Sequence, residues 1–146
     1  MLWQVMQEAQ RVKIPPVMVI QVEDSMDVML ARNIARRAAS LLGFNTASRA
    51  QVASAVASLV GVILNAGERQ VINLHGLRQG VEVGIQVICD APWLADASPE
   101  NATVALRAKM GKIMDEISLV STATPHIEMV LWLTAERSKQ SNPPHS

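Results

Sequence analysis

The chain is short of aromatic residues, cysteine and net charge. Its 146 residues include one phenylalanine, three tryptophans and no tyrosine, so the core must consist largely of aliphatic side chains and methionine. The single cysteine, Cys89, excludes an internal disulfide and is typical of a reducing compartment. Basic and acidic residues balance at 13 each, which removes any general electrostatic case for binding nucleic acid or an anionic membrane.

Targeting and membrane signals are also missing from the sequence. The N-terminal stretch MLWQVMQEAQRVK lacks the continuous apolar region and the small-residue cleavage site of a secretory signal peptide. No segment reaches the roughly 20 consecutive apolar residues of a membrane span. We therefore expect a soluble, cytoplasmic protein with one domain and a substantial core.

The patterns that are present predict eight elements in the order β-α-α-β-β-α-β-β. This order is typical of an α+β fold, a two-layer α/β sandwich with three helices on one face of a mainly antiparallel sheet. We expect an N-terminal extension over 1–16, the domain over 17–134 and a disordered tail over 135–146. The predicted elements are a strand at Val17–Val22, helices ending at Gly43 and near Asn65, strands at Gln70–Leu77 and Val81–Asp90, a helix at Asn101–Glu116, and strands at Ile117–Ser121 and Ile127–Thr134.

The first strand and first helix carry the most specific local predictions. Pro15 and Pro16 cannot donate ladder hydrogen bonds, so we expect the strand to begin at Val17, at an edge of the sheet. Asp24 or Ser25 is expected to cap the helix that follows. Its periodicity predicts one buried face and places three arginines away from it. The residues of the predicted buried face are Leu30, Ala31, Ile34, Ala35, Ala38, Leu41 and Leu42.

The second predicted helix contains an uninterrupted run without charge or amide. Residues 52–64 read VASAVASLVGVIL. A helix without a polar face is expected to be covered on both sides. We therefore expect it to be the central helix on the sheet, with Ser54, Ser58 and Gly61 shielded from solvent.

The segment Asp27–Phe44, DVMLARNIARRAASLLGF, resembles the first helix of the anti-sigma serine kinases of bacterial partner-switching systems, and the switch kinases of stress-response modules above all. These kinases belong to the GHKL superfamily, which includes the ATPase domains of histidine kinases. The resemblance continues at Ala66-Gly67 and Ile113–Ser121, covers roughly Val17–Leu133, and implies the histidine-kinase-like ATPase fold. The matching residues of the first helix are Asp27, Val28, Ala31, Arg32, Arg36, Leu42, Gly43 and Phe44.

The nucleotide-binding boxes of that family are not preserved. The family's second helix carries a glutamate that positions the attacking group and, four residues later, an asparagine that binds magnesium; Ser58 and Val62 align with them. Valine offers no oxygen to a hard cation. The adenine box, Asp-x-Gly-x-Gly in the family, reads Asp90-Ala91-Pro92-Trp93-Leu94 and has lost both glycines. The phosphate-binding glycine turn aligns with VALRA at 104–108, which contains no glycine.

These losses predict a non-catalytic regulatory protein that keeps the family's docking scaffold and works without a cofactor. Asp90 is the only nucleotide-box residue that survives, and no catalytic or metal-binding residue is predicted. The alternative is an ATP-dependent protein serine kinase or anti-sigma factor with a divergent site for ATP and Mg²⁺. A third reading places a different small ligand in the old pocket.

The resemblance also implies the class of partner. Members of the family bind anti-sigma antagonist domains, sigma factors or related regulators, and we expect such a partner rather than nucleic acid or a membrane. Arg32, Arg36 and Arg37 are candidates for docking an acidic partner. Trp3, in the apolar N-terminal extension, is a candidate for self-association as a homodimer.

Each candidate also has a purely structural explanation. The arginines can form an ordinary solvated helix face, and Asp90 can cap the turn before Pro92. Trp93 can fill the vacated adenine pocket or cover an edge of the core. The three histidines show no metal-ligand spacing, and Cys89 has no acid–base partner evident in the sequence.

Overall fold

Five antiparallel strands and three α-helices make up the part of the chain that the computed structural model describes, residues 10–139. The strands form one sheet in the order β1-β2-β3-β5-β4, and every neighbouring pair in it is antiparallel. The elements are β1 (Arg11–Val22), α2 (Asp27–Leu41), α3 (Thr46–Asn65), β2 (Gln70–Gln79), β3 (Glu82–Asp90), the 3-10 helix η1 (Pro92–Leu94), α4 (Pro99–Met110), β4 (Glu116–Val120), β5 (His126–Trp132) and the 3-10 helix η2 (Ala135–Arg137).

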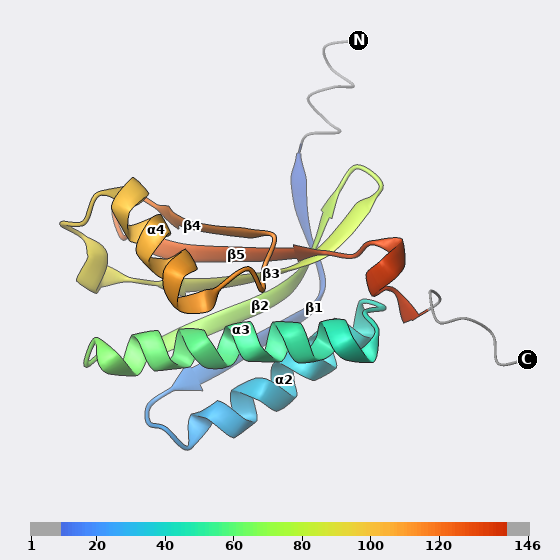
Figure 1. Ribbon diagram of the computed structural model, residues 1–146, viewed down its shortest axis with the longest axis horizontal. Coiled ribbons are helices and arrows are strands. Elements are labelled where there is room, and N and C mark those ends of the chain that lie inside the picture. Colours follow the sequence, from blue (N-terminus) through green and yellow to red (C-terminus); the bar gives the residue numbers. More distant parts are fainter. Residues whose placement is uncertain (1–9, 140–146) are drawn as a thin grey trace, which may run out of the picture.

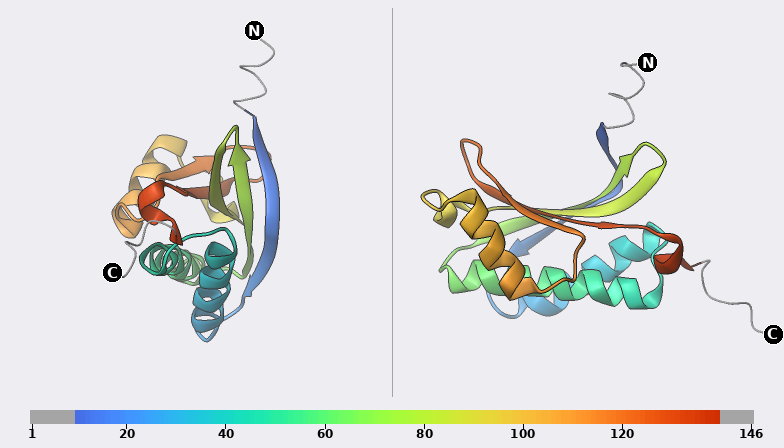
Figure 2. Two further views of the ribbon diagram at one scale, coloured as in Figure 1. Left: turned by 90° about the vertical axis from the view of Figure 1, so that its right-hand side faces the viewer. Right: turned by 45° about the horizontal axis from the view of Figure 1, so that its top comes forward.

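The elements form two layers, with all three α-helices on one face of the sheet (Figure 1 and Figure 2). The predicted order β-α-α-β-β-α-β-β and the α+β class are confirmed. Helix α3 runs beside α2, and α4 lies over the β4–β5 side of the sheet. The other face of the sheet is not covered by any helix of the described residues.

The core lies between α3 and the inner face of the sheet. Residues of α3 such as Val56, Leu59 and Ile63 are fully buried, and they face buried strand residues such as Leu74 and Leu131. We expected this helix to be covered by protein on both sides, and the structure covers its outer side only in part. Ser54, Ser58 and Gly61 are half-buried rather than enclosed.

Helix α3 is also long and apolar enough to cross a membrane, contrary to the expectation that no segment would be. A core helix of a soluble protein meets the same criteria of length and composition, so the result is weak evidence for a span. The burial of its apolar side chains inside a small globular fold is consistent with a soluble protein.

Helix α2 buries its alanines, not its leucines. Ala31, Ala35 and Ala38 are fully buried, whereas Leu30 and Leu41 keep 52% and 64% of their surface exposed. The predicted buried face is therefore wrong for Leu30 and Leu41, whereas Ile34 and Leu42 are half-buried against the core. Small side chains allow α2 to approach its neighbours closely, and the bulkier ones are turned toward solvent.

Strand β1 begins six residues earlier than predicted. Arg11–Ile14 already pair with β2, and the register shifts between Ile14 and Val17, where the cis-linked Pro15 and Pro16 form a bulge. Proline is tolerated in an edge strand because a bulge does not need its missing donor. The predicted boundary at Val17 is therefore wrong, although β1 does lie at an edge.

The C-terminal half contains two further corrections. Helix α4 ends at Met110 rather than Glu116, because Gly111 adopts a left-handed φ of 66°. The tail expected to be disordered from residue 135 begins instead with η2, and the Lys139 ammonium donates to the carbonyl oxygen of Ser40 at 2.8 Å. Residues 140–146 lie outside the described part of the chain.

Candidate functional site

A small hollow lies between α3, η1 and α4, where the resemblance places the nucleotide. Its volume is about 190 Å³. The turn η1 connects β3 to α4 and brings Trp93 and Leu94 against the two helices. We call this site the α3–α4 hollow; its walls include Val62, Trp93, Leu94, Ala105, Leu106 and Lys109.

The α3–α4 hollow does not fit MgATP. Magnesium requires oxygen ligands, and neither a carboxylate nor an amide side chain lines the hollow. Ser58 lies one turn before Val62 on α3 and is not part of the lining. The volume is also below the roughly 300–1,000 Å³ of sites that hold drug-sized ligands. Trp93 was expected either to fill the vacated adenine pocket or to cover an edge of the core. The structure places it at the wall of this hollow, packed against the core.

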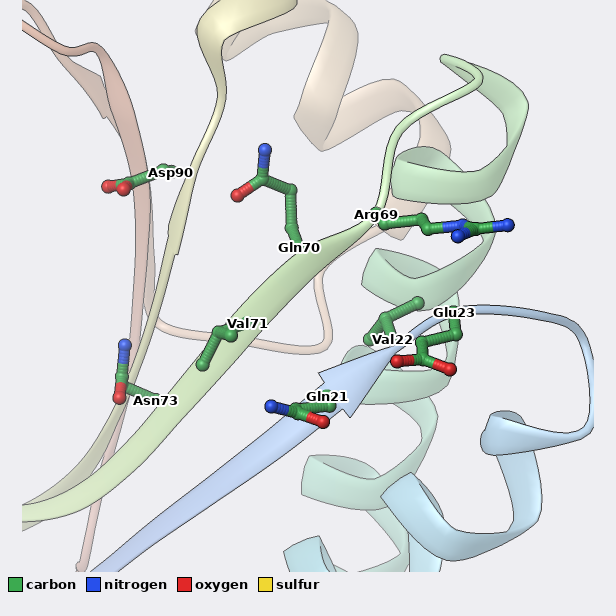
Figure 3. Close-up of a pocket in the computed structure, with 8 residues that line it drawn as sticks. All are labelled: Gln21, Val22, Glu23, Arg69, Gln70, Val71, Asn73 and Asp90. Carbon is green, nitrogen blue, oxygen red and sulfur yellow. The ribbon is translucent and has the colours of Figure 1, made fainter.

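Asp90 lies on the opposite face of the sheet. Its neighbour Cys89 is fully buried in the core, and successive side chains of a strand point to opposite faces, so Asp90 faces outward. It lines a separate open hollow of about 300 Å³ at the end of β1, β2 and β3 (Figure 3). The structure therefore does not bring Asp90 together with Val62 and Trp93.

The hollow beside Asp90 is lined by polar side chains of mixed charge, together with Val22 and Val71. Three adjacent strands contribute Gln21, Asn73 and Asp90 (Figure 3). Glu23 directly follows β1, and Arg69 directly precedes β2. Amides, carboxylates and a guanidinium together offer donors and acceptors of every kind, and this set does not select one class of ligand.

The three candidate arginines lie on α2, beside exposed apolar side chains. Arg36 and Arg37 are exposed and Arg32 is half-buried, and none of the three forms an ion pair with another described residue. Positions four and seven apart on a helix share a face, so Arg37 lies on the same face as Leu41 and Leu30. We call this surface the α2 outer face; it comprises Met26, Met29, Leu30, Arg36, Arg37 and Leu41, of which Met26 is 83% exposed.

The start of α2 is fixed by Asp27 rather than by the predicted caps. Its carboxylate accepts hydrogen bonds from the backbone N–H groups of Glu23 and Asp24, at 2.7 and 3.0 Å. These two bonds lower the pKa of Asp27 below its usual value. The N-cap residue is Met26, which has no side-chain cap, so the prediction of Asp24 or Ser25 as the cap is wrong. The carboxylate of Asp27 thus holds the connection from β1 to α2.

Cys89 and the histidines carry no catalytic arrangement in the described part of the chain. Burial, together with the neighbouring charge of Asp90, raises the pKa of the Cys89 thiol to about 12. The buried ring of His75 bonds the carbonyl oxygen of Gly76 at 2.9 Å, and His126 pairs with Glu128 at 3.2 Å. Residues 10–139 contain no cluster of three or more metal-ligating side chains.

Two features of these sites were not predicted from the sequence. The exposure of Leu30 and Leu41 was missed, because large apolar residues at helical spacing usually mark a core face. The place of Lys109 at an apolar hollow was also not predicted, because it depends on the position of η1. Trp3, the candidate for self-association, lies outside the described residues.

Comparisons with known proteins add no relative. Neither a scan against protein-family models nor a search of the curated proteins finds a match for this chain.

Proposed function

We propose that the protein is a non-catalytic regulator with a degenerate histidine-kinase-like ATPase fold that works by docking a partner on the α2 outer face. The partner is a regulatory protein of the anti-sigma antagonist or sigma-factor class. The element order and the antiparallel sheet are compatible with that fold. The segment that carries the sequence resemblance, Asp27–Phe44, includes the helix that presents this face.

The observation that carries the proposal is the composition of the α2 outer face. Met29, Leu30 and Leu41 keep more than half of their surface exposed, next to two arginines without an ion pair among residues 10–139. An exposed apolar strip with adjacent guanidinium groups suits a partner that combines apolar and carboxylate side chains. Arginine binds carboxylates in a bidentate manner, which fixes the orientation of the partner.

The lining of the α3–α4 hollow supports the non-catalytic part of the proposal. Phosphoryl transfer depends on positioning the nucleotide and on neutralising charge with a metal ion. The side chains of this hollow are apolar apart from Lys109, and Asp90 lies on the other face of the sheet. A scaffold that keeps its docking helix and lacks these groups is suited to binding alone.

The proposal is tested by reversing charge on the α2 outer face. The variant Arg36→Glu/Arg37→Glu is compared with Arg78→Glu, which changes an exposed arginine of β2. Tagged wild type is used to enrich binding partners from a lysate of the cells that make the protein. The enriched regulator is then purified, and its affinity for wild type and for each variant is measured by titration. We expect wild type and Arg78→Glu to bind it equally and the double variant to bind at least about tenfold more weakly, because like charges then meet at the interface.

Two results would contradict the proposal. One is equal binding of the regulator by the double variant. The other is transfer of phosphate from ATP to the regulator by the purified protein, which would favour the serine kinase reading. Circular dichroism of each variant confirms that a loss of binding does not come from unfolding.

A further inference from the structure

We infer that the α3–α4 hollow binds a small aromatic carboxylate, with its ring between Val62 and Trp93 and its carboxylate at Lys109. This inference goes beyond the proposed function, because it concerns a different surface from the α2 outer face and a small molecule rather than a protein.

The shape of the hollow follows from small residues on α4. Ala102 and Ala105 lie three residues apart on the side of α4 that faces α3 and η1, and their methyl groups leave space between the elements. Leu106 is 5% exposed and Trp93 and Leu94 are packed against the core, so the walls are firmly placed. The core side of the hollow is therefore fixed by packing, and Ala105 and Lys109 lie at its exposed side.

The volume of the hollow selects the size of the ligand. A cavity of about 150 Å³ with aliphatic and aromatic walls is enough to hold benzene. The α3–α4 hollow measures about 190 Å³ and is partly open to solvent, which leaves room for one ring and a methylene group, with the carboxylate at the open side beside Lys109. Trp93 offers an aromatic wall for ring-to-ring contact. A purine with a ribose and phosphates is too large for this space.

The charge at the hollow selects the polar group of the ligand. Lys109 follows Ala105 by four residues, on the same side of α4, and it is exposed. It forms no ion pair with any residue between 10 and 139, and no acidic side chain lines the hollow. A carboxylate next to the ring therefore gains a charge-assisted hydrogen bond, whereas an ammonium group is repelled.

The test uses three probes of similar size that differ in charge. Phenylacetate, neutral phenylacetamide and cationic phenethylamine are titrated into the full-length protein by calorimetry, with tryptophan fluorescence as a second signal. For a ligand of this size we expect phenylacetate to bind with a Kd on the order of 0.1–1 mM. We expect the amide to bind more weakly and the amine not to bind.

Two variants and a matched control locate the site. Lys109→Met keeps the aliphatic stem and is expected to weaken phenylacetate binding by about 5-fold or more, without changing the affinity for the amide. Lys112→Met removes another exposed lysine, outside the lining of the hollow, and should have no effect. Ala105→Phe fills the hollow and should abolish binding of both ligands.

The inference is overturned if phenylacetate does not bind at 10 mM, or if phenethylamine binds as tightly as phenylacetate. Equal affinity in wild type and Lys109→Met, or retained binding by a folded Ala105→Phe variant, would overturn it as well. These outcomes do not depend on the charge reversals on α2. A failure of the ligand proposal therefore does not contradict the docking proposal, and the reverse is also true.

Discussion

At the residue scale, Cys89 is predicted to be chemically inert in the folded protein. Its side chain is fully buried and the pKa of its thiol is raised to about 12, chiefly by burial. The thiolate is the reactive form, and at pH 8 it makes up only about one part in ten thousand. We expect no reaction with a chromogenic disulfide reagent in buffer, and one reactive thiol per chain in 6 M guanidinium. Rapid labelling of the native protein would contradict this prediction.

Asp115 is predicted to stabilise the fold in a pH-dependent way. Partial burial acts to raise the pKa of Asp115, but hydrogen bonds from the Arg137 side chain and the Trp132 backbone N–H outweigh it and lower the pKa. A lowered carboxyl pKa contributes stability above the unfolded value, near 3.8, and this contribution is lost as the pH falls through the folded pKa. The carboxylate therefore fastens η2 to the end of β5 at neutral pH.

The variant Asp115→Asn measures this contribution. At pH 7 we expect it to lower the free energy of unfolding by about 1 kcal/mol, a value that allows for the 31% exposure of the side chain. Near pH 3 the difference from wild type should shrink. Urea unfolding at the two pH values gives both numbers, and Asp96→Asn, on an exposed loop, serves as the control. A loss that is equal at both pH values would show that charge is not involved.

At the scale of single elements, two glycines are predicted to respond to alanine in opposite directions. A Cβ at Gly76 would lie 2.8 Å from the Ile14 side chain and 2.8 Å from the Pro15 carbonyl oxygen, at the bulge of β1. Backbone cannot move aside easily, so Gly76→Ala should destabilise the protein by about 1–3 kcal/mol. A Cβ at Gly61, inside α3, would meet nothing within 4 Å.

Gly61→Ala should therefore stabilise the protein by about 0.5–1 kcal/mol through helix propensity. Urea midpoints of the two variants, measured in the same buffer, check both values. Shifts of the same sign would contradict the account of the β1 bulge, because the crowding at Gly76 is what separates the two sites.

Element boundaries show where sequence patterns were sufficient and where they were not. The two strands of the β2–β3 hairpin were predicted at Gln70–Leu77 and Val81–Asp90, and Gly80, with a positive φ of 62°, lies in the turn between them. The start of β1 was not predicted correctly. A proline indicates that a ladder hydrogen bond is missing, but it does not indicate whether the strand continues on the other side of a bulge. The buried face of α2 was misassigned because a narrow gap selects alanine over leucine, and the width of a gap is a tertiary property.

At the scale of the whole molecule, the arrangement of layers was predictable and the sites were not. Alternating helical and strand periods give the order of elements, which leaves few topologies for a chain of this length. The side of the sheet on which Asp90 lies depends on the strand register that buries Cys89, and a one-residue difference reverses it. The α3–α4 hollow depends on where η1 places Trp93, which no local pattern records.

The whole molecule is predicted not to gain stability from MgATP. A ligand at 100 times its Kd adds about 2.7 kcal/mol to the free energy of unfolding. For a domain of this size, that corresponds to an increase in Tm of roughly 5–10 °C. With 5 mM MgATP we expect a shift below about 1 °C relative to MgCl₂ alone, measured by differential scanning calorimetry. An increase in Tm of 5 °C or more would contradict the non-catalytic proposal.

Introducing on α3 the glutamate and asparagine of the anti-sigma serine kinases is not expected to create a nucleotide site. In Ser58→Glu/Val62→Asn, Trp93 and Leu94 still wall the α3–α4 hollow, and Asp90 still faces the other side of the sheet. The new carboxylate at the half-buried position 58 would lower stability on its own. The comparison is therefore made within the variant, with and without MgATP. A nucleotide-dependent rise in Tm of the double variant alone would show that the scaffold still holds an ATP pocket and lacks only these two groups.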